Sequence, residues 1–193
     1  MNNVKKQFIE TLQEIADYII SNSEKIDSTS IITLIEKIIE INNKGNRVFI
    51  YGAGRSGFMG RAFAQRLMHL GINSCFVSDA VTYRYTANDL ALVISGSGET
   101  TSSVAIAQKA YKIGGFIALL TGTPKSTIGA LSNLIITIEG KSKDKATSQK
   151  TLAPYTSLFD ICTLSVLDSI GGVLMTYLKV TEEDIDNRHA SIE

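Results

Sequence analysis

Two short β-rich runs each lead directly into a glycine-rich loop and then into a helical segment, and this pattern constrains the fold most. Residues 48–51 precede a loop at 52–57 that reads GAGRSG, and residues 90–94 precede a loop at 95–100 that reads SGSGET. Three further apolar runs, at 74–77, 116–120 and 134–138, alternate with helical patterns. Alternating strands and helices build βαβ units, and strands that are apolar throughout are covered by helices on both faces. We therefore expect an α/β fold, a three-layer αβα sandwich around a five-stranded parallel sheet.

Helical patterns flank this core on both sides within one predicted domain, 1–193. Residues 1–45 are expected to form two N-terminal helices, residues 46–139 the sheet core, and residues 152–193 the C-terminal helices and tail. Ser28 and Ser30 are both able to cap the second helix. The apolar stripe from Ile31 to Ile41 is too wide for one contact, so we expect that helix to pack on two sides, for example on its own sheet and on a second subunit. The polar stretch at 140–150 reads as a solvated linker.

The composition narrows the classes of partner. The 19 basic and 19 acidic residues give a formal net charge of zero, whereas a nucleic-acid binder more often carries a basic excess. Apolar runs stay short of the ~20 residues of a membrane span, and the N-terminus lacks a signal-like apolar region, so we expect neither nucleic acid nor membrane as partner and a cytoplasmic protein. Cys75 and Cys162 are expected to be buried free thiols. No Cys/His cluster with zinc spacing is present in the sequence, so no metal site is expected.

The first glycine loop, 52–57, matches G-x-G-x-x-G between a strand and a helix. This is the dinucleotide-binding fingerprint, and Asp79 lies at the distance where a ribose-binding acid would stand. A nicotinamide-dependent oxidoreductase is therefore one hypothesis. The physics of the motif is more general, because glycines admit a close ligand and a helix N-terminus offers free N–H groups to any anion.

The second glycine loop, 95–100, favours a different ligand. Its serines and threonines, continuing to Ser103, place several hydroxyl donors beside a helix N-terminus, which makes a phosphate cradle without net positive charge. The alternative is that these residues only cap the helix and form the turn. A third hydroxylic turn at 121–127 completes the pocket wall or is merely a turn. Arg55 and Arg61 are further anion partners, whereas Arg66 is expected to make a structural ion pair.

Three motifs together, GAGRSG at 52–57, RLMHLG at 66–71 and SGSGET at 95–100, resemble the SIS (sugar isomerase) domain family, and within it most closely the 6-phospho-3-hexuloisomerases. The resemblance implies a flavodoxin-like SIS fold, a small phosphorylated sugar as ligand, no cofactor, no metal and a homotetramer. It implies substrate binding by Ser56, Arg55, Ser95, Ser97 and Thr100. The implied activity is isomerisation of hexulose 6-phosphate to fructose 6-phosphate by base-catalysed enediol chemistry.

The implied reaction needs a base that takes a proton from the carbon next to a carbonyl. The family places a glutamate early in the long C-terminal helix, and this chain has Asp160 there, one methylene shorter. Asp160 is thus the expected base, and His69 and His189 are expected to transfer protons or contact the sugar. The shortened carboxylate keeps a second hypothesis open, a non-catalytic phosphosugar-binding module.

Overall fold

The sheet has the expected parallel design in the computed structural model, which describes residues 1–141 and 150–191. Its strands are β1 (Val48–Gly52), β2 (Ser74–Phe76), β3 (Leu90–Ile94), β4 (Phe116–Thr121) and β5 (Leu134–Thr137). They lie in the order β2-β1-β3-β4-β5, and every neighbouring pair is parallel. This is the strand order of flavodoxin-like folds, so the predicted fold class is confirmed.

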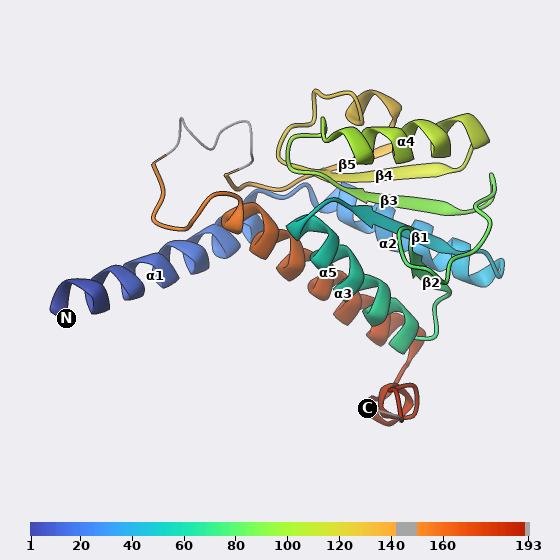
Figure 1. The fold of residues 1–193 in the computed structure, drawn as a ribbon. Helices are drawn as coiled ribbons and strands as arrows, with labels where there is room; N and C mark the ends of the chain where they lie inside the picture. Colours follow the sequence, from blue (N-terminus) through green and yellow to red (C-terminus); the bar gives the residue numbers. More distant parts are fainter. Residues whose placement is uncertain (142–149, 192–193) are drawn as a thin grey trace.

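Helices cover both faces of the sheet, as its apolar strands predict (Figure 1). On one face lies α4 (Thr101–Ile113), with the short 3-10 turn η1 (Gly129–Leu131) packed against it. On the other face lie α2 (Ser28–Asn43) and α3 (Arg55–His69), with α5 (Ser157–Leu178) packed against both. The short helix α6 (Glu182–Asp186) follows, and Thr181 and Asp184 form its capping box.

The apolar stripe of α2 is covered mostly within the chain. Leu34, Ile38, Ile39 and Ile41 are buried against the sheet and α5, and only Ile32 in the stripe is more than half exposed. The second partner of α2 within the described chain is therefore α5, and packing of α2 on another subunit stays a prediction. Asp27 caps α2 by accepting from the N–H groups of residues 29 and 30, instead of Ser28 or Ser30, because its carboxylate reaches both donors.

Helix α5 is an exception to the expectation that every apolar run stays short of the length of a membrane span. It is long and apolar enough, by length and composition, to cross a membrane. Half of its apolar window is buried, because α5 packs on α3, α2 and α1. A buried core helix passes the same test, so the apolar character of α5 is explained by packing.

Two smaller predictions also have outcomes. Cys75 and Cys162 are buried and free, as expected. Of the stretch read as a solvated linker, residues 142–149 lie outside the described residues. Lys141 in that stretch is 8% exposed, and its ammonium donates to Thr151 Oγ1 at 3.2 Å, so solvation is wrong for this residue.

Candidate functional site

Three loops meet at the carboxyl edge of the sheet because β1, β3 and β4 are adjacent and parallel. The loops after β3 and β4 are bonded to each other. Gly122 N donates to Gly96 O at 3.0 Å, and Ile128 N donates to Gly98 O at 3.2 Å. The third hydroxylic turn at 121–127, whose role the sequence left open, thus forms one wall with the SGSGET loop.

A carboxylate clamps these two loops together. Thr127 donates its backbone N–H to Glu99 Oε1 at 2.6 Å and its hydroxyl to Oε2 at 2.7 Å. The same bonds, the backbone one first, hold the pKa of Glu99 below its usual range. Glu99 is consequently a fixed negative charge at the loop, and its oxygens are already engaged.

The glycines of the first loop are required by its own backbone. A Cβ on Gly52 would lie 2.7 Å from the backbone of Ser56, and one on Gly57 would lie 2.6 Å from Gly52 O. Gly54 has φ 58° and ψ −129°, a conformation that L side chains rarely adopt. The fingerprint is thus explained by a tight turn into α3, and it does not by itself indicate a dinucleotide.

The dinucleotide hypothesis also needs a free acid, and Asp79 is already paired. Arg61 contacts its Oδ1 through Nε at 3.1 Å and through a terminal nitrogen at 2.9 Å. The same guanidinium stacks over the ring of Phe76 at 3.9 Å. Arg61 and Asp79 form an ion pair beside β2, so Asp79 is not the free acid that a ribose hydroxyl would need. Arg66 pairs with Asp168 at 3.3 Å, the structural ion pair predicted for it.

The hydroxyls of the SGSGET loop differ in whether they already form hydrogen bonds within the protein. Ser95 is 3% exposed, and its Oγ accepts from Gly98 N at 3.2 Å, so it shapes the turn. Ser97 Oγ accepts from Glu99 N at 3.2 Å and keeps its own O–H as a donor. Thr100 is the N-cap residue of α4, yet its side chain makes no capping bond. Among the described residues of this loop, Thr100 and Ser97 are therefore best disposed to donate to a phosphate, beside the free N–H groups of the α4 N-terminus.

Asp160 lies close to the first loop, in a buried network. Its side chain is 1% exposed. Oδ1 accepts from Ser56 Oγ at 3.1 Å, while Oδ2 accepts from Arg55 Nε at 3.0 Å and from Thr156 Oγ1 at 2.9 Å. The network joins the glycine loop to the start of α5. Both carboxylate oxygens are engaged, so the geometry favours a positioning role for Asp160 over the expected role of base.

The network also draws in residues expected to bind substrate. Ser56 donates to Asp160 and not to open space, whereas the Arg55 side chain is 58% exposed and has four further N–H donors for an anion. Thr156, which the sequence reading did not single out, is the third member. Its spacing of four residues from Asp160 on a helix start is the signal that would have indicated it.

The two histidines lie together at the other edge of the sheet. His69 ends α3, which begins at the glycine loop, so about 21 Å of helix separates the histidine from that loop. The rings of His69 and His189 are 4.2 Å apart and tilted by 32°. Arg188 donates to His69 O at 2.9 Å, which fixes the C-terminal segment on α3. Burial, then the neighbouring His189 and Arg66, lower the pKa of His69.

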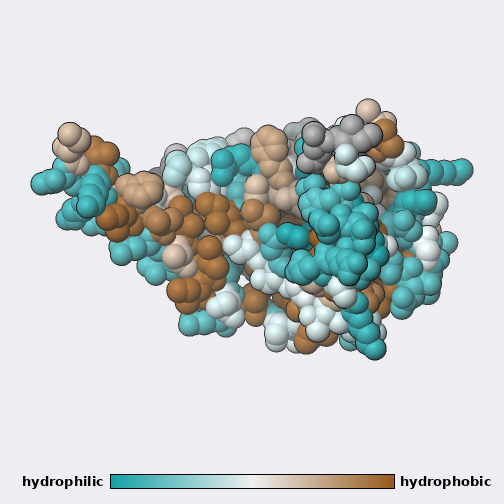
Figure 2. All heavy atoms as spheres, turned by 90° about the horizontal axis from the view of Figure 1, so that it is seen from below, coloured by the Kyte–Doolittle hydropathy of each residue, from teal (hydrophilic) through white to brown (hydrophobic). Residues whose placement is uncertain are grey.

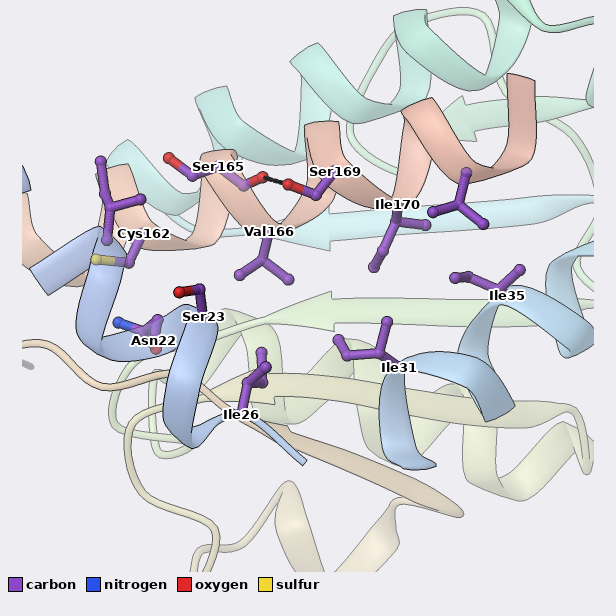
Figure 3. Close-up of a pocket in the computed structure, with 12 residues that line it drawn as sticks. Asn22, Ser23, Ile26, Ile31, Ile35, Cys162, Ser165, Val166, Ser169 and Ile170 are labelled. Carbon is purple, nitrogen blue, oxygen red and sulfur yellow. Dashed lines mark hydrogen bonds between the residues drawn. The ribbon is translucent and has the colours of Figure 1, made fainter. Parts of the chain in front are cut away.

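A separate groove lies between α1 (Asn2–Lys25), α2 and α5, away from the three loops (Figure 3). Its volume is about 230 Å³, and isoleucine and valine side chains form most of its wall. Its one thiol, Cys162, has a pKa raised to about 11 by burial, which suits an inert residue. Within residues 1–141 and 150–191, no group of three His, Cys, Asp or Glu side chains could hold a metal ion.

Residues 40–165 match the family model of the SIS domain, which is more than half of the chain. The chain belongs to the SIS domain family. A 3-hexulose-6-phosphate isomerase of Bacillus subtilis is 40% identical over 149 residues, 77% of this chain and 80% of that protein. A 3-hexulose-6-phosphate isomerase of Mycobacterium gastri is 32% identical over 182 residues, 94% of this chain and 89% of that protein.

Solved structures agree with the fold. A Methanococcus jannaschii protein, whose crystal structure infers a molecular function of 3-hexulose-6-phosphate isomerase, superposes with a TM-score of 0.81 at 32% identity, covering 94% of this chain and 98% of that one. A Listeria monocytogenes protein is 20% identical with a TM-score of 0.83, covers 98% of this chain and 97% of that one, and supports the fold alone. The glycine loops at 52–57 and 95–100 both lie inside the region that matches the family model.

Proposed function

We propose that this SIS protein is a phosphosugar isomerase that interconverts 3-hexulose 6-phosphate and fructose 6-phosphate. The observation that carries the proposal is the pair of adjacent loops at the carboxyl edge, with the Thr100 and Ser97 hydroxyls at the N-terminus of α4. Hydroxyl donors and unpaired N–H groups suit a phosphate dianion. The 40% and 32% identical relatives named 3-hexulose-6-phosphate isomerase support the substrate class.

The reaction is a proton transfer between neighbouring carbons. A base removes the proton on carbon 2 of the 3-ketose, the electrons form a 2,3-enediol, and a proton returns to carbon 3 as the carbonyl forms at carbon 2. The exposed Arg55 guanidinium lies beside the glycine loop and can stabilise negative charge on the enediol oxygens. No redox cofactor is consumed, because the substrate and product are isomers.

The three expected catalytic residues fall into two sets. Asp160 lies beside the loops but is engaged by Arg55, Ser56 and Thr156, so in this proposal it holds the loop in place. His69 and His189 are too distant to act in the site of their own chain. They can serve the reaction only in the site of a neighbouring copy, which is consistent with the predicted homotetramer. The tetramer and the cytoplasmic location stay predictions.

The proposal is tested by binding and turnover measured on the same sample. We expect calorimetry to give saturable binding of fructose 6-phosphate and none of NAD, together with conversion of 3-hexulose 6-phosphate. Saturable binding without turnover would support the non-catalytic binding module, which the engaged oxygens of Asp160 favour. Binding of NAD without any sugar phosphate would support the oxidoreductase.

A further inference from the structure

A side chain from α1 holds the turn that leads into α5. Glu14 Oε2 accepts from the backbone N–H of Leu152 at 2.9 Å and from that of Ala153 at 2.7 Å. Ala153 is 1% exposed, and a buried backbone N–H needs a protein acceptor because water does not reach it. Figure 1 shows the turn, in orange, beside α1. We call residues 151–156 the α5 turn, and Glu14 reaches it across 138 positions of the chain.

The α5 turn has a constrained backbone. Tyr155 has φ 43°, in the left-handed region that residues other than glycine seldom adopt. Such a conformation persists where neighbouring contacts hold it. Within the turn and at its end, Thr151 Oγ1 donates to Ala153 O at 3.1 Å, and Ser157 N donates to Pro154 O at 3.0 Å. The two bonds to Glu14 add an anchor on α1, outside the turn.

The other end of the α5 turn belongs to the buried network at the candidate site. Thr156 is the N-cap residue of α5, and its Oγ1 donates to Asp160 Oδ2 at 2.9 Å. Arg55 Nε donates to the same oxygen at 3.0 Å. Ala153 and Thr156 are three positions apart, so the chain between them spans at most about 11 Å. A shift of the turn at Ala153 therefore reaches the oxygen that orients Arg55.

We propose that Glu14 is a positioning residue for the candidate active site. Its carboxylate fixes the α5 turn. The turn places Thr156 on Asp160, and Asp160 orients the exposed guanidinium of Arg55. The proposal rests on the proposed function, in which that guanidinium stabilises the enediol. The hydroxyls of the SGSGET loop lie on a different loop, so loss of Glu14 should lower turnover and leave sugar-phosphate binding nearly unchanged.

Three variants of α1 test this role. Glu14→Ala removes the acceptor and keeps a strong helix former, whereas Glu14→Gln keeps an oxygen at the same reach. Glu10→Ala is the matched control, because Glu10 lies one turn earlier on α1, its side chain is 46% exposed, and it pairs with Lys6 at 3.7 Å. Figure 2 shows the N-terminal end of α1 standing clear of the body of the protein.

Steady-state kinetics separate positioning from binding. A misplacement of about 1 Å can cost about 100-fold in rate, so for a loosened turn we expect Glu14→Ala to lower kcat about 10-fold with KM within about twofold of wild type. Glu14→Gln should regain most of this loss, because it restores the acceptor. Glu10→Ala should match wild type in both constants.

A ¹⁵N spectrum reports on the far end of the contacts without any substrate. The Nε–H of Arg55 is protected from exchange with water while it is bonded to Asp160, and the loss of its signal in Arg55→Lys assigns it. We expect Glu14→Ala to speed this exchange at least about 10-fold and Glu10→Ala to leave it unchanged. If wild type turns over no hexulose phosphate and Glu14→Ala still speeds the exchange, the proposed function fails and the positioning role stands.

Glu14→Asp is the second variant if Glu14→Ala does not fold. It retracts the carboxylate by one methylene and should show the same two changes at smaller size. An unchanged exchange rate of the Arg55 Nε–H in a folded Glu14→Ala or Glu14→Asp protein would overturn the proposal. So would an active enzyme whose kcat is unchanged in these variants, an equal loss of kcat in Glu10→Ala, or an effect on KM alone.

Discussion

Replacing Asp160 by asparagine removes the charge of the buried network and keeps its size. The carboxylate is 1% exposed and accepts from three side chains, at 2.9, 3.0 and 3.1 Å. Breaking a buried ion pair costs about 3–5 kcal/mol. Arg55 is 58% exposed and regains water, and the amide oxygen keeps part of the bonding, so we expect the free energy of unfolding to fall by about 2–3 kcal/mol. For a chain of this size, the melting temperature should fall by roughly 4–12 °C.

Asp168→Asn is the control for this change. Asp168 lies on the same helix and pairs with Arg66 at 3.3 Å, but its side chain is 50% exposed, so its loss should cost less than about 1 kcal/mol. Both variants are unfolded in urea at one protein concentration, because an assembly makes stability depend on concentration. Turnover is measured alongside. If Asp160→Asn keeps wild-type stability and sugar-phosphate affinity but loses all turnover, Asp160 is the base and the positioning role is wrong.

Three further changes address the loops and the histidines. Thr100→Ala removes a hydroxyl that has no capping bond, so calorimetry should show sugar-phosphate binding weakened roughly 10- to 150-fold with an unchanged melting temperature. Glu99 has a pKa lowered from 4.5, so its clamp stabilises the fold above pH 4.5 and is lost as the pH falls through the lowered value. The urea midpoint of Glu99→Gln should therefore not show the part of the wild-type decrease below pH 4.5 that comes from protonation of Glu99. His69 has a lowered pKa, so stability should be full above pH 6.5 and fall below it, and His69→Gln should flatten this slope.

The arrangement of the loops was predictable, because parallel strands bring their carboxyl ends to one edge. The strand patterns and the two glycine loops together predict that residues 52–57 and 95–100 lie side by side. The need for glycine at positions 52, 54 and 57 was also predictable, because a tight strand-to-helix turn leaves no room for other side chains there.

The sequence pattern of a single segment could not predict which side chains pair with each other in the fold. Asp160 and Arg55 are 105 positions apart in the chain, and His69 and His189 are 120 positions apart, so neither pairing leaves a mark in the spacing of one segment. For a related reason the apolar stripe of α2 did not predict that α5 of the same chain covers most of it. A stripe indicates that an apolar side needs a partner, but it does not say whether α5 or another subunit supplies it.

The most direct test of the proposed isomerase follows the substrate carbonyl itself. 3-Hexulose 6-phosphate labelled with ¹³C is incubated with the wild-type chain, without nicotinamide cofactor, and carbon NMR spectra are recorded over time. We expect the carbonyl signal of carbon 3 to decline while that of carbon 2 of fructose 6-phosphate grows to equilibrium. A carbonyl that stays on carbon 3, although the sugar phosphate binds saturably, would contradict the isomerase and leave a phosphosugar-binding protein.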